Sequence, residues 1–281
     1  MAALASVAVG RRDARVLPGF GLSMGFTLFY LSALVLVPLA ALVIRPWELG
    51  FGGFWKAVSA PRVLSALELS FGAAALAAAI NTLFGLILAW VLVRYRLPAK
   101  RLIDALVDLP FALPTAVAGV SLSALYANNG WIGALLSKFG IKIAYTPAGV
   151  VVALVFIGLP FVVRTLEPVL ADLGREAEEA AATLGASRLQ TFHRVVLPSL
   201  APALITGAAL AFARAVGEYG SVIFIAGNLP MVSEIAPLLI VIKLQEYDYA
   251  GAAAIGLVML AISFAMLLAL NALQAWAAAR Q

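Results

Sequence analysis

Arg214 and Glu218 are the charged residues whose spacing points most directly to a defined chemistry. They lie four residues apart inside an apolar stretch that runs from about 199 to 226, and residues at this spacing share one face of a helix. A lone arginine at the centre of a membrane-spanning helix costs about 2.5–3.5 kcal/mol on insertion scales, and pairing offsets that cost. We therefore expect an intramembrane ion pair, which either gates a polar path or only locks helices together.

Neutral polar side chains in the other apolar stretches form a second group. Asn81, Thr115, Ser121 and Ser123 offer amide and hydroxyl groups at positions that are otherwise surrounded by apolar residues. Such groups can line a polar path through a membrane protein, or they can hold helices together by hydrogen bonds. The sequence leaves both roles open for each of them.

Other reactive side chains are scarce. The chain has no cysteine and a single histidine, His193, which excludes disulfides, thiolate metal sites and the two-histidine zinc-protease motif. No Gly-x4-Gly-Lys-Ser/Thr loop occurs, so there is no recognisable phosphate loop for ATP. We expect no catalytic residue, no metal site and no cofactor bound by this chain, and we interpret His193 as structural.

The elements that position these residues follow from composition. Of 281 residues, 64% are hydrophobic and only 12% are charged, with a mean hydropathy of +1.04, whereas soluble domains carry about 25% charged residues. Most of the surface must therefore face lipid, and the sequence predicts an all-α, polytopic membrane protein with six spanning helices. Their approximate ranges are 20–44, 66–93, 105–127, 147–170, 199–226 and 249–275.

The connections between these ranges are short, so the sequence predicts one transmembrane domain over residues 1–281. Pro110 and Pro114 fall in the third range, which we therefore expect to be bent and to line something. The segment 227–248 is apolar but too short to span, so it either re-enters the membrane or caps the bundle. Basic residues precede the first apolar range without a cleavage pattern after it, and we interpret that range as a retained helix.

The distribution of Lys and Arg indicates the orientation. A roughly two-to-one excess lies at the two termini and in the segments 94–104 and 164–198, and such an excess marks the cytoplasmic side. We therefore expect both termini, and the long segment between the fourth and fifth spans, in the cytoplasm.

That segment, residues 171–198, has a helix–glycine–helix pattern. Residues 175–184 favour a helix with acidic residues in its first turn, Gly185 suits a left-handed terminating position, and Ser187 suits an N-cap for a second short helix that ends before Pro198. Helix physics alone allows two roles. The segment either covers the ends of the spans or docks into a partner protein.

The full pattern of this segment resembles the signature of binding-protein-dependent ABC importer permeases, with valine in place of isoleucine at position 195. The resemblance implies a type I ABC importer permease fold in which this segment is the pair of coupling helices that docks on the ATP-binding subunit. It also implies a non-catalytic subunit, with ATP and magnesium bound by that partner. The positions that carry the resemblance to coupling helices are Glu179, Ala180, Ala181, Gly185, Leu197 and Pro198.

Three further motifs, over 108–119, 160–164 and 214–220, resemble the sulfate/thiosulfate branch of these permeases and its T-type subunit. The resemblance implies transport of sulfate or thiosulfate across the bacterial inner membrane by alternating access. The implied partners are ATP-binding cassette subunits, a second related permease subunit and a periplasmic sulfate/thiosulfate-binding protein, and no nucleic acid. Donors such as Thr115, Ser121 and Asn81, with Arg214 and Glu218 as a gate, suit a dianion that must not bind tightly.

Other functions stay open at this point. The motif at 214–220 is shared with molybdate permeases, so molybdate, tungstate or another oxyanion is the alternative cargo. A secondary transporter driven by an ion gradient would require internal repeats and midplane carboxylates, and only Glu218 is a candidate. An intramembrane enzyme would require a nucleophile with a base, and the chain shows no such motif.

Overall fold

A computed structural model describes residues 20–278, and all regular secondary structure in that range is helical. Five helical segments of the described residues are long and apolar enough to span a membrane, and a sixth span is formed if one bent pair is counted. This confirms the predicted all-α membrane fold. The chain divides into two compact units between Ile44 and Arg45.

The first unit consists of one continuous helical stretch. It contains α1 (Phe20–Leu31), a π-helical turn (Ser32–Leu36) and α2 (Val37–Ile44), without an Asp, Glu, Lys or Arg. The π turn lies just before Pro38. Proline has no backbone N–H, so it cannot donate a hydrogen bond to a carbonyl of the preceding turn. This stretch agrees with the predicted first span.

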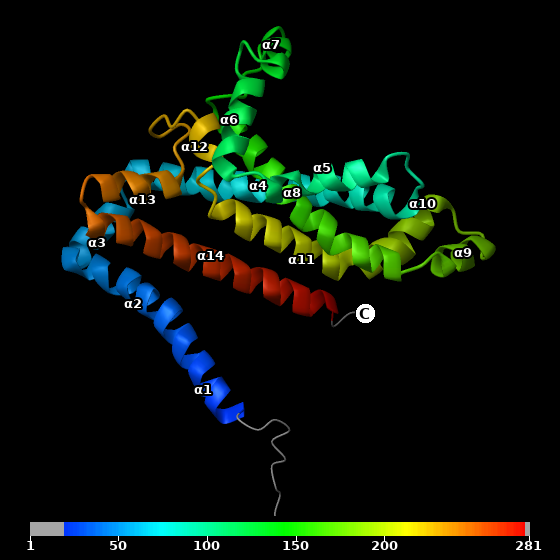
Figure 1. The fold of residues 1–281 in the computed structure, drawn as a ribbon, viewed down its shortest axis with the longest axis horizontal. Coiled ribbons are helices and arrows are strands. Elements are labelled where there is room, and N and C mark those ends of the chain that lie inside the picture. Colours follow the sequence, from blue (N-terminus) through cyan, green and yellow to red (C-terminus); the bar gives the residue numbers. More distant parts are fainter. Residues whose placement is uncertain (1–19, 279–281) are drawn as a thin grey trace, which may run out of the picture. The chain divides into compact units, whose positions relative to one another are not determined.

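Three long helices form the core of the second unit: α4 (Pro61–Arg94), α8 (Pro147–Asp172) and α11 (Leu197–Val216), with α14 (Tyr249–Ala278) packed against α11 (Figure 1). Small residues allow the three to approach closely. A Cβ atom built on Gly85 would lie 2.7 Å from Val162 Cγ1, and one built on Gly207 would lie 3.1 Å from Val162 Cα. Val162 is therefore enclosed by a glycine on each neighbouring helix.

The third predicted span is broken. It consists of α5 (Lys100–Ala112) and α6 (Thr115–Tyr126), whose axes are bent by 113°. The expected bend is present and its cause is local, because a proline disfavours helical backbone in the residue before it. Leu113 is extended, and Pro114 starts the new helix at its N-cap, whereas Pro110 lies within α5 without ending it.

The fifth predicted span differs from expectation at both ends. Its helix ends at Val216 rather than near residue 226, because the chain turns at residues 217–221 and only then forms the short α12 (Val222–Ile225). At the other end, the second helix of the 171–198 segment does not end before Pro198. It continues through a π-helical turn (Phe192–Val196) into α11, and this wider turn lies just before Pro198, as the other π turn lies before Pro38.

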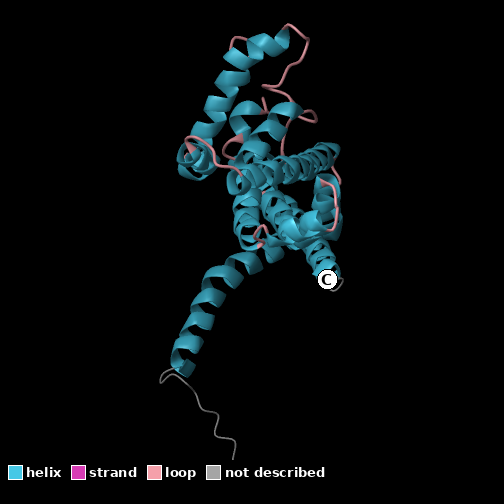
Figure 2. Cartoon of the chain, turned by 90° about the vertical axis from the view of Figure 1, so that its right-hand side faces the viewer, coloured by secondary structure: helices cyan, strands magenta, loops and turns pink. Residues whose placement is uncertain are grey.

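The remaining elements lie at the end of the bundle opposite the 171–198 segment (Figure 1), or project from it as α7 does, which is the helix at the top of both views (Figures 1 and 2). They are a 3-10 turn (Arg45–Leu49), α3 (Gly50–Val58), α7 (Trp131–Ser137) and α13 (Ala236–Gln245). The segment 227–248 forms a loop and α13, which packs against α4 and α14. Its backbone is fixed by Ala236 N, which donates to Ser70 Oγ at 2.8 Å.

Asp248 determines where α14 begins. Its Oδ1 accepts from Gly251 N at 2.9 Å, and its Oδ2 lies 3.1 Å from Lys243 Nζ. The hydrogen bond from Gly251 and the ion pair with Lys243 lower the pKa of Asp248 below its usual range. The cap is therefore anionic, which also suits the positive end of the helix dipole.

Candidate functional site

The first candidate site is the α9–α10 hairpin, which we define as residues 173–196. It contains α9 (Glu176–Thr183) and α10 (Arg188–Thr191), joined through Gly185 at φ +83°. The expected N-cap at Ser187 is present as a reciprocal capping box: Gln190 N donates to Ser187 Oγ at 3.3 Å, and Ser187 N donates to Gln190 Oε1 at 2.8 Å. The helix–glycine–helix pattern predicted from the sequence is confirmed.

The six predicted coupling positions fall into two groups. Glu179, Ala180 and Gly185 are exposed on the hairpin and Ala181 is half-buried beside them, whereas the Leu197–Pro198 pair lies at the start of α11, at the base of the hairpin.

Two further residues were not predicted. Leu184 and Leu189 flank the Gly185 turn and are 88% and 68% exposed. They give the tip of this otherwise charged hairpin an apolar character. Their position beside the glycine was the sequence signal for them.

Arg94, at the end of α4, fastens the hairpin to the bundle. Its Nη2 donates to the carbonyl of Gly174 at 2.6 Å and forms an ion pair with Glu178 Oε1 at 2.7 Å. Arg175 Nη2 in turn donates to the carbonyl of Arg94 at 2.9 Å. These contacts tie the start of the hairpin to the end of α4.

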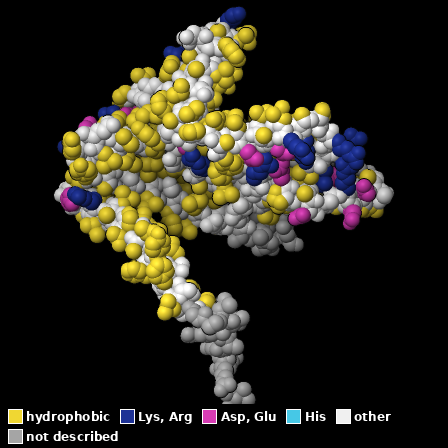
Figure 3. All heavy atoms as spheres, in the orientation of Figure 1, with side chains coloured by type: hydrophobic (Ala, Val, Ile, Leu, Met, Phe, Trp, Pro, Cys, Tyr) yellow, Lys and Arg dark blue, Asp and Glu magenta, His cyan; other side chains and the backbone are white. Residues whose placement is uncertain are grey.

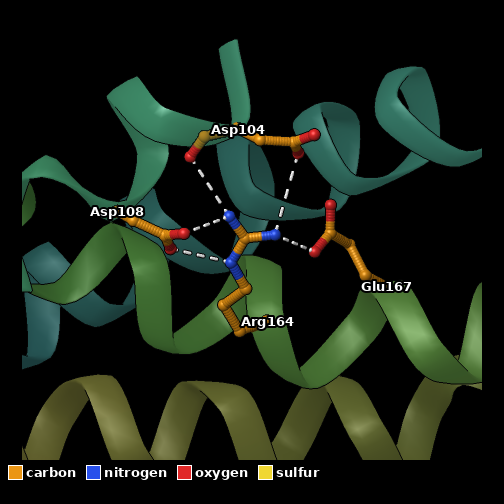
Figure 4. A network of polar contacts seen from close by, with 4 residues as sticks. All are labelled: Asp104, Asp108, Arg164 and Glu167. Carbon is orange, nitrogen blue, oxygen red and sulfur yellow. Dashed lines mark hydrogen bonds and ion pairs between the residues drawn. The ribbon is translucent and has the colours of Figure 1, made fainter. Parts of the chain in front are cut away.

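A second polar network joins α5 to α8 (Figure 4). The Arg164 guanidinium forms a bidentate contact with Asp108, with Nε–Oδ1 at 2.8 Å and Nη2–Oδ2 at 2.6 Å. It also pairs with Glu167 and, through Nη1, with Asp104 Oδ1 at 3.7 Å, and Nη2 donates to the carbonyl of Asp104 at 3.1 Å. The helix that leads into the hairpin is thus linked to the bent span. Asp108 and Arg164 each belong to a motif noted in the sequence, but nothing in the sequence showed that the two residues meet.

We expect Arg164→Ala to destabilise the protein by about 2 kcal/mol, because three carboxylates would remain close together without a cation and part of the penalty would be relieved by solvent. The measurement is the midpoint of thermal unfolding in detergent. Arg101→Ala is the matched control, because Arg101 is exposed on the same helix as Asp104 and forms no ion pair with a described residue. An unchanged midpoint for Arg164→Ala would contradict the structural importance of this network.

The second candidate site is the intramembrane pair, which the structure contains as the sequence suggested. Arg214 Nη1 lies 2.6 Å from Glu218 Oε2. The other carboxylate oxygen, Oε1, accepts from Ser221 N at 2.8 Å and from Ser221 Oγ at 3.0 Å. Glu218 is only 3% exposed, whereas Arg214 is 33% exposed. The carboxylate is therefore a buried anchor for the turn after α11, and the guanidinium is the accessible partner.

The turn after α11 (residues 217–221) and the bend between α5 and α6 lie against each other. A Cβ atom on Gly220 would come within 2.1 Å of Thr115 Oγ1, and one on Gly119 within 2.3 Å of the carbonyl of Ser221. Two interrupted helices that meet inside a membrane protein leave backbone groups that need polar surroundings. The structure thus brings Thr115 to the turn that carries Glu218.

The other predicted path residues lie elsewhere. Asn81, on α4, is 1% exposed and packs against α8, where a Cβ atom on Gly158 would lie 2.4 Å from its Nδ2. Its amide finds no hydrogen-bond partner among the described residues. Ser121 is exposed on α6, and Ser123 donates to Tyr145 Oη at 3.1 Å.

His193 and the acidic residues provide no metal site within residues 20–278. No group of three or more His, Cys, Asp or Glu side chains among the described residues is placed to hold a metal ion. The exposed His193 ring packs edge-on against Phe192, with ring centroids 5.4 Å apart.

Comparisons with known proteins give consistent results. The model of the family described as "Binding-protein-dependent transport system inner membrane component" matches residues 81–281. Proteins named "Sulfate transport system permease protein CysT" are similar over nearly their whole length. The one from Salmonella typhimurium is 51% identical over 92% of this chain and 94% of its own length, and the one from Escherichia coli is 50% identical with the same coverage.

Solved structures of low sequence identity share the fold. A chain of a bacterial ABC transporter involved in the import of the acidic polysaccharide alginate superposes with a TM-score of 0.75 at 14% identity, over 91% of this chain and 95% of its own. A chain of the MetNI methionine ABC transporter superposes with a TM-score of 0.56 at 17% identity, over 76% of this chain and 95% of its own.

Proposed function

Because this chain belongs to the family of binding-protein-dependent transport system inner membrane components, we propose that it is the permease subunit of an ATP-driven sulfate importer. The observation that carries the proposal is the 51% identity to a sulfate permease over 92% of this chain. A match over 260 of the 281 residues leaves room for few unmatched positions, so it supports the same role for the chain as a whole.

The roles of the other subunits can be proposed from the missing phosphate loop and from the exposed hairpin. It has no phosphate loop, so ATP and magnesium belong to separate ATP-binding cassette subunits, and this subunit is not itself an enzyme. Those subunits bind the α9–α10 hairpin through Glu179, Ala180 and the Gly185 turn. A second related permease subunit completes the path, and a periplasmic binding protein delivers sulfate or thiosulfate. Both termini lie in the cytoplasm of the bacterial cell.

The structure suggests how force from the ATPase reaches the path. Closure of the ATPase subunits displaces the hairpin, and the Arg94 contacts pass that displacement to α4. The same displacement moves α8, and the Arg164 network carries α5 with it. The bend between α5 and α6 then shifts against the turn after α11, which opens one side of the path and closes the other. This is alternating access driven from the hairpin.

The polar path passes the junction of the two broken spans. There the accessible Arg214 guanidinium, the Thr115 hydroxyl and the first N–H groups of α6 offer hydrogen-bond donors, which a dehydrated dianion requires. The charge of Arg214 is offset by Glu218, so an anion is attracted without being trapped. Ser121 adds a further donor along α6. Asn81 is buried where helices pack and contributes to that packing instead of lining the path.

The proposal is tested by uptake of labelled sulfate in cells that lack their own sulfate importers and express this chain with its partner subunits. We expect uptake that stops on ATP depletion and is reduced by excess unlabelled thiosulfate. Uptake that survives ATP depletion but collapses with an uncoupler would instead indicate a secondary transporter. Uptake of labelled molybdate in place of sulfate would contradict the assigned cargo and leave the importer mechanism intact.

A further inference from the structure

A cavity of about 390 Å³, lined by both charged and apolar residues, lies between the end of α4 and the α9–α10 hairpin. Arginines from three elements line it: Arg94 from α4, Arg175 from the start of the hairpin and Arg188 from α10. Figure 3 shows Lys and Arg side chains gathered at this end of the bundle. The contacts of Arg94 with Gly174 and Glu178 take part in the proposed transport mechanism, but the cavity beside them has no role in it.

An apolar groove of about 760 Å³ runs along the outer face of α4 and reaches the start of α11. Leu83, Leu86, Ile87 and Val91 form its floor, and Leu197 lies at its far side. Leu83 and Ile87 are more than half exposed, and in a membrane-spanning helix such a surface faces acyl chains.

The cavity and the groove adjoin each other. Trp90, Tyr95 and Phe192 line both of them, and the rings of Trp90 and Phe192 pack edge to face with centroids 5.8 Å apart. Tryptophan and tyrosine near the end of a spanning helix mark the level of the lipid headgroups. The groove therefore lies in the hydrocarbon layer, and the cavity lies at headgroup level.

The charge in the cavity favours an anion. Arg94 is 10% exposed and is paired with Glu178, but its Nε has no hydrogen-bond partner among the described residues. Neither Arg175 nor Arg188 forms an ion pair with a described residue, and Glu179 is the one unpaired carboxylate in the lining. After the Arg94–Glu178 pair is set aside, the lining carries two guanidinium groups against one carboxylate.

We propose that the cavity and the groove together bind one anionic phospholipid, with its phosphodiester between Arg175 and Arg188 and an acyl chain along α4. Basic pockets between spanning helices at the inner membrane surface are suited to such headgroups. The groove distinguishes a lipid from a free phosphate, since a soluble anion would gain nothing from apolar surface beside the basic cavity. The inference depends on the membrane assignment and is independent of the cargo.

The test is native mass spectrometry of the purified full-length chain, presented with equal amounts of phosphatidylglycerol and phosphatidylcholine. We expect preferential retention of phosphatidylglycerol, and a loss of about tenfold in that retention for the Arg175→Ala/Arg188→Ala double variant. Arg96→Ala is the matched control, because Arg96 is an exposed basic residue at the same level that lines neither cavity. Equal retention of the two lipids, or an unaffected double variant, would overturn the proposal.

A second variant leaves every arginine in place. Ile87→Trp fills the groove and is expected to reduce phosphatidylglycerol retention, whereas Leu76→Trp, at an exposed position on α4 outside the groove, should not. Excess glycerol 3-phosphate should compete poorly with the lipid. If it displaces phosphatidylglycerol at equal concentration, or if Ile87→Trp retains lipid like the wild type, the site binds a soluble phosphate ester and the lipid assignment is wrong.

Discussion

Replacing Gly185 with proline is expected to abolish sulfate uptake, although the chain still inserts into the membrane. Gly185 has φ +83°, a conformation that proline, with φ fixed near −65°, cannot adopt. The substitution also removes the hydrogen bond from Gly185 N to the carbonyl of Ala182 at 3.0 Å. The turn must therefore rearrange, and Leu184 and Leu189 no longer present one surface to the ATPase subunit.

The measurements are labelled-sulfate uptake, ATP hydrolysis by the purified complex in the presence of the loaded binding protein, and the amount of chain in the membrane. Gly140→Pro is a closely matched control. Gly140 also has a positive φ, of +72°, its N–H donates to the carbonyl of Ser137 at 3.0 Å, and a Cβ atom there would meet nothing within 4 Å, as at Gly185. It lies between α7 and α8, away from the hairpin, so its uptake should stay near that of the wild type.

Reversing the charge of Glu179 tests the same surface without changing the backbone conformation. Glu179→Lys should also abolish uptake and substrate-stimulated ATP hydrolysis, while Glu176→Lys, at an exposed position in the same first turn, should have the smaller effect. Normal transport by both Gly185→Pro and Glu179→Lys would show that the hairpin is not the docking site.

The hairpin could be predicted from the sequence because its determinants are local. Helix-forming residues, a glycine at the left-handed position and the Ser187–Gln190 capping box all lie within one short segment, and each acts on its neighbours in the chain. The spans could be predicted for a different reason. Lipid selects apolar surface wherever a helix crosses it, so hydropathy alone marks where the helices are.

Hydropathy gave wrong helix ends where an apolar segment does not continue the helix. Residues 217–226 stay largely apolar, so the fifth span was extended through them, yet the backbone turns at Gly217 and Glu218 is held by Ser221. Pro114 predicted a bend in the third span, but nothing in the sequence showed that this bend contacts Gly220. Contacts between helices depend on packing that a single sequence does not reveal.

The polar networks were missed for a related reason. Arg94 and Gly174 are 80 residues apart, and Arg164 and Asp108 are 56 residues apart. The sequence shows charged residues at the ends of spans, where a solvated side chain is the ordinary expectation. Only the fold identifies which of them meet, and it is these pairs that connect the hairpin to α4 and α5 to α8.

Arg214→Ala is expected to destabilise the protein by about 3 kcal/mol, because it leaves the buried Glu218 carboxylate without its cation. The partners of Glu218 Oε1 on Ser221 remain, so the loss arises from the unpaired charge. Adding Glu218→Gln removes that charge and keeps an acceptor for Ser221. The double variant should therefore recover much of the lost stability, measured as the midpoint of thermal unfolding in detergent. Failure of the second substitution to raise the midpoint would contradict this account.

Uptake by the double variant then decides between the two roles that the sequence left open for this pair. If stability and sulfate uptake recover together, the pair only locks the turn after α11 in place. If stability recovers and uptake does not, the accessible guanidinium at the junction of the broken spans acts on the anion itself. We expect the second result, because Arg214 is 33% exposed while its partner is buried, so its guanidinium is free to contact an anion at the junction of the broken spans.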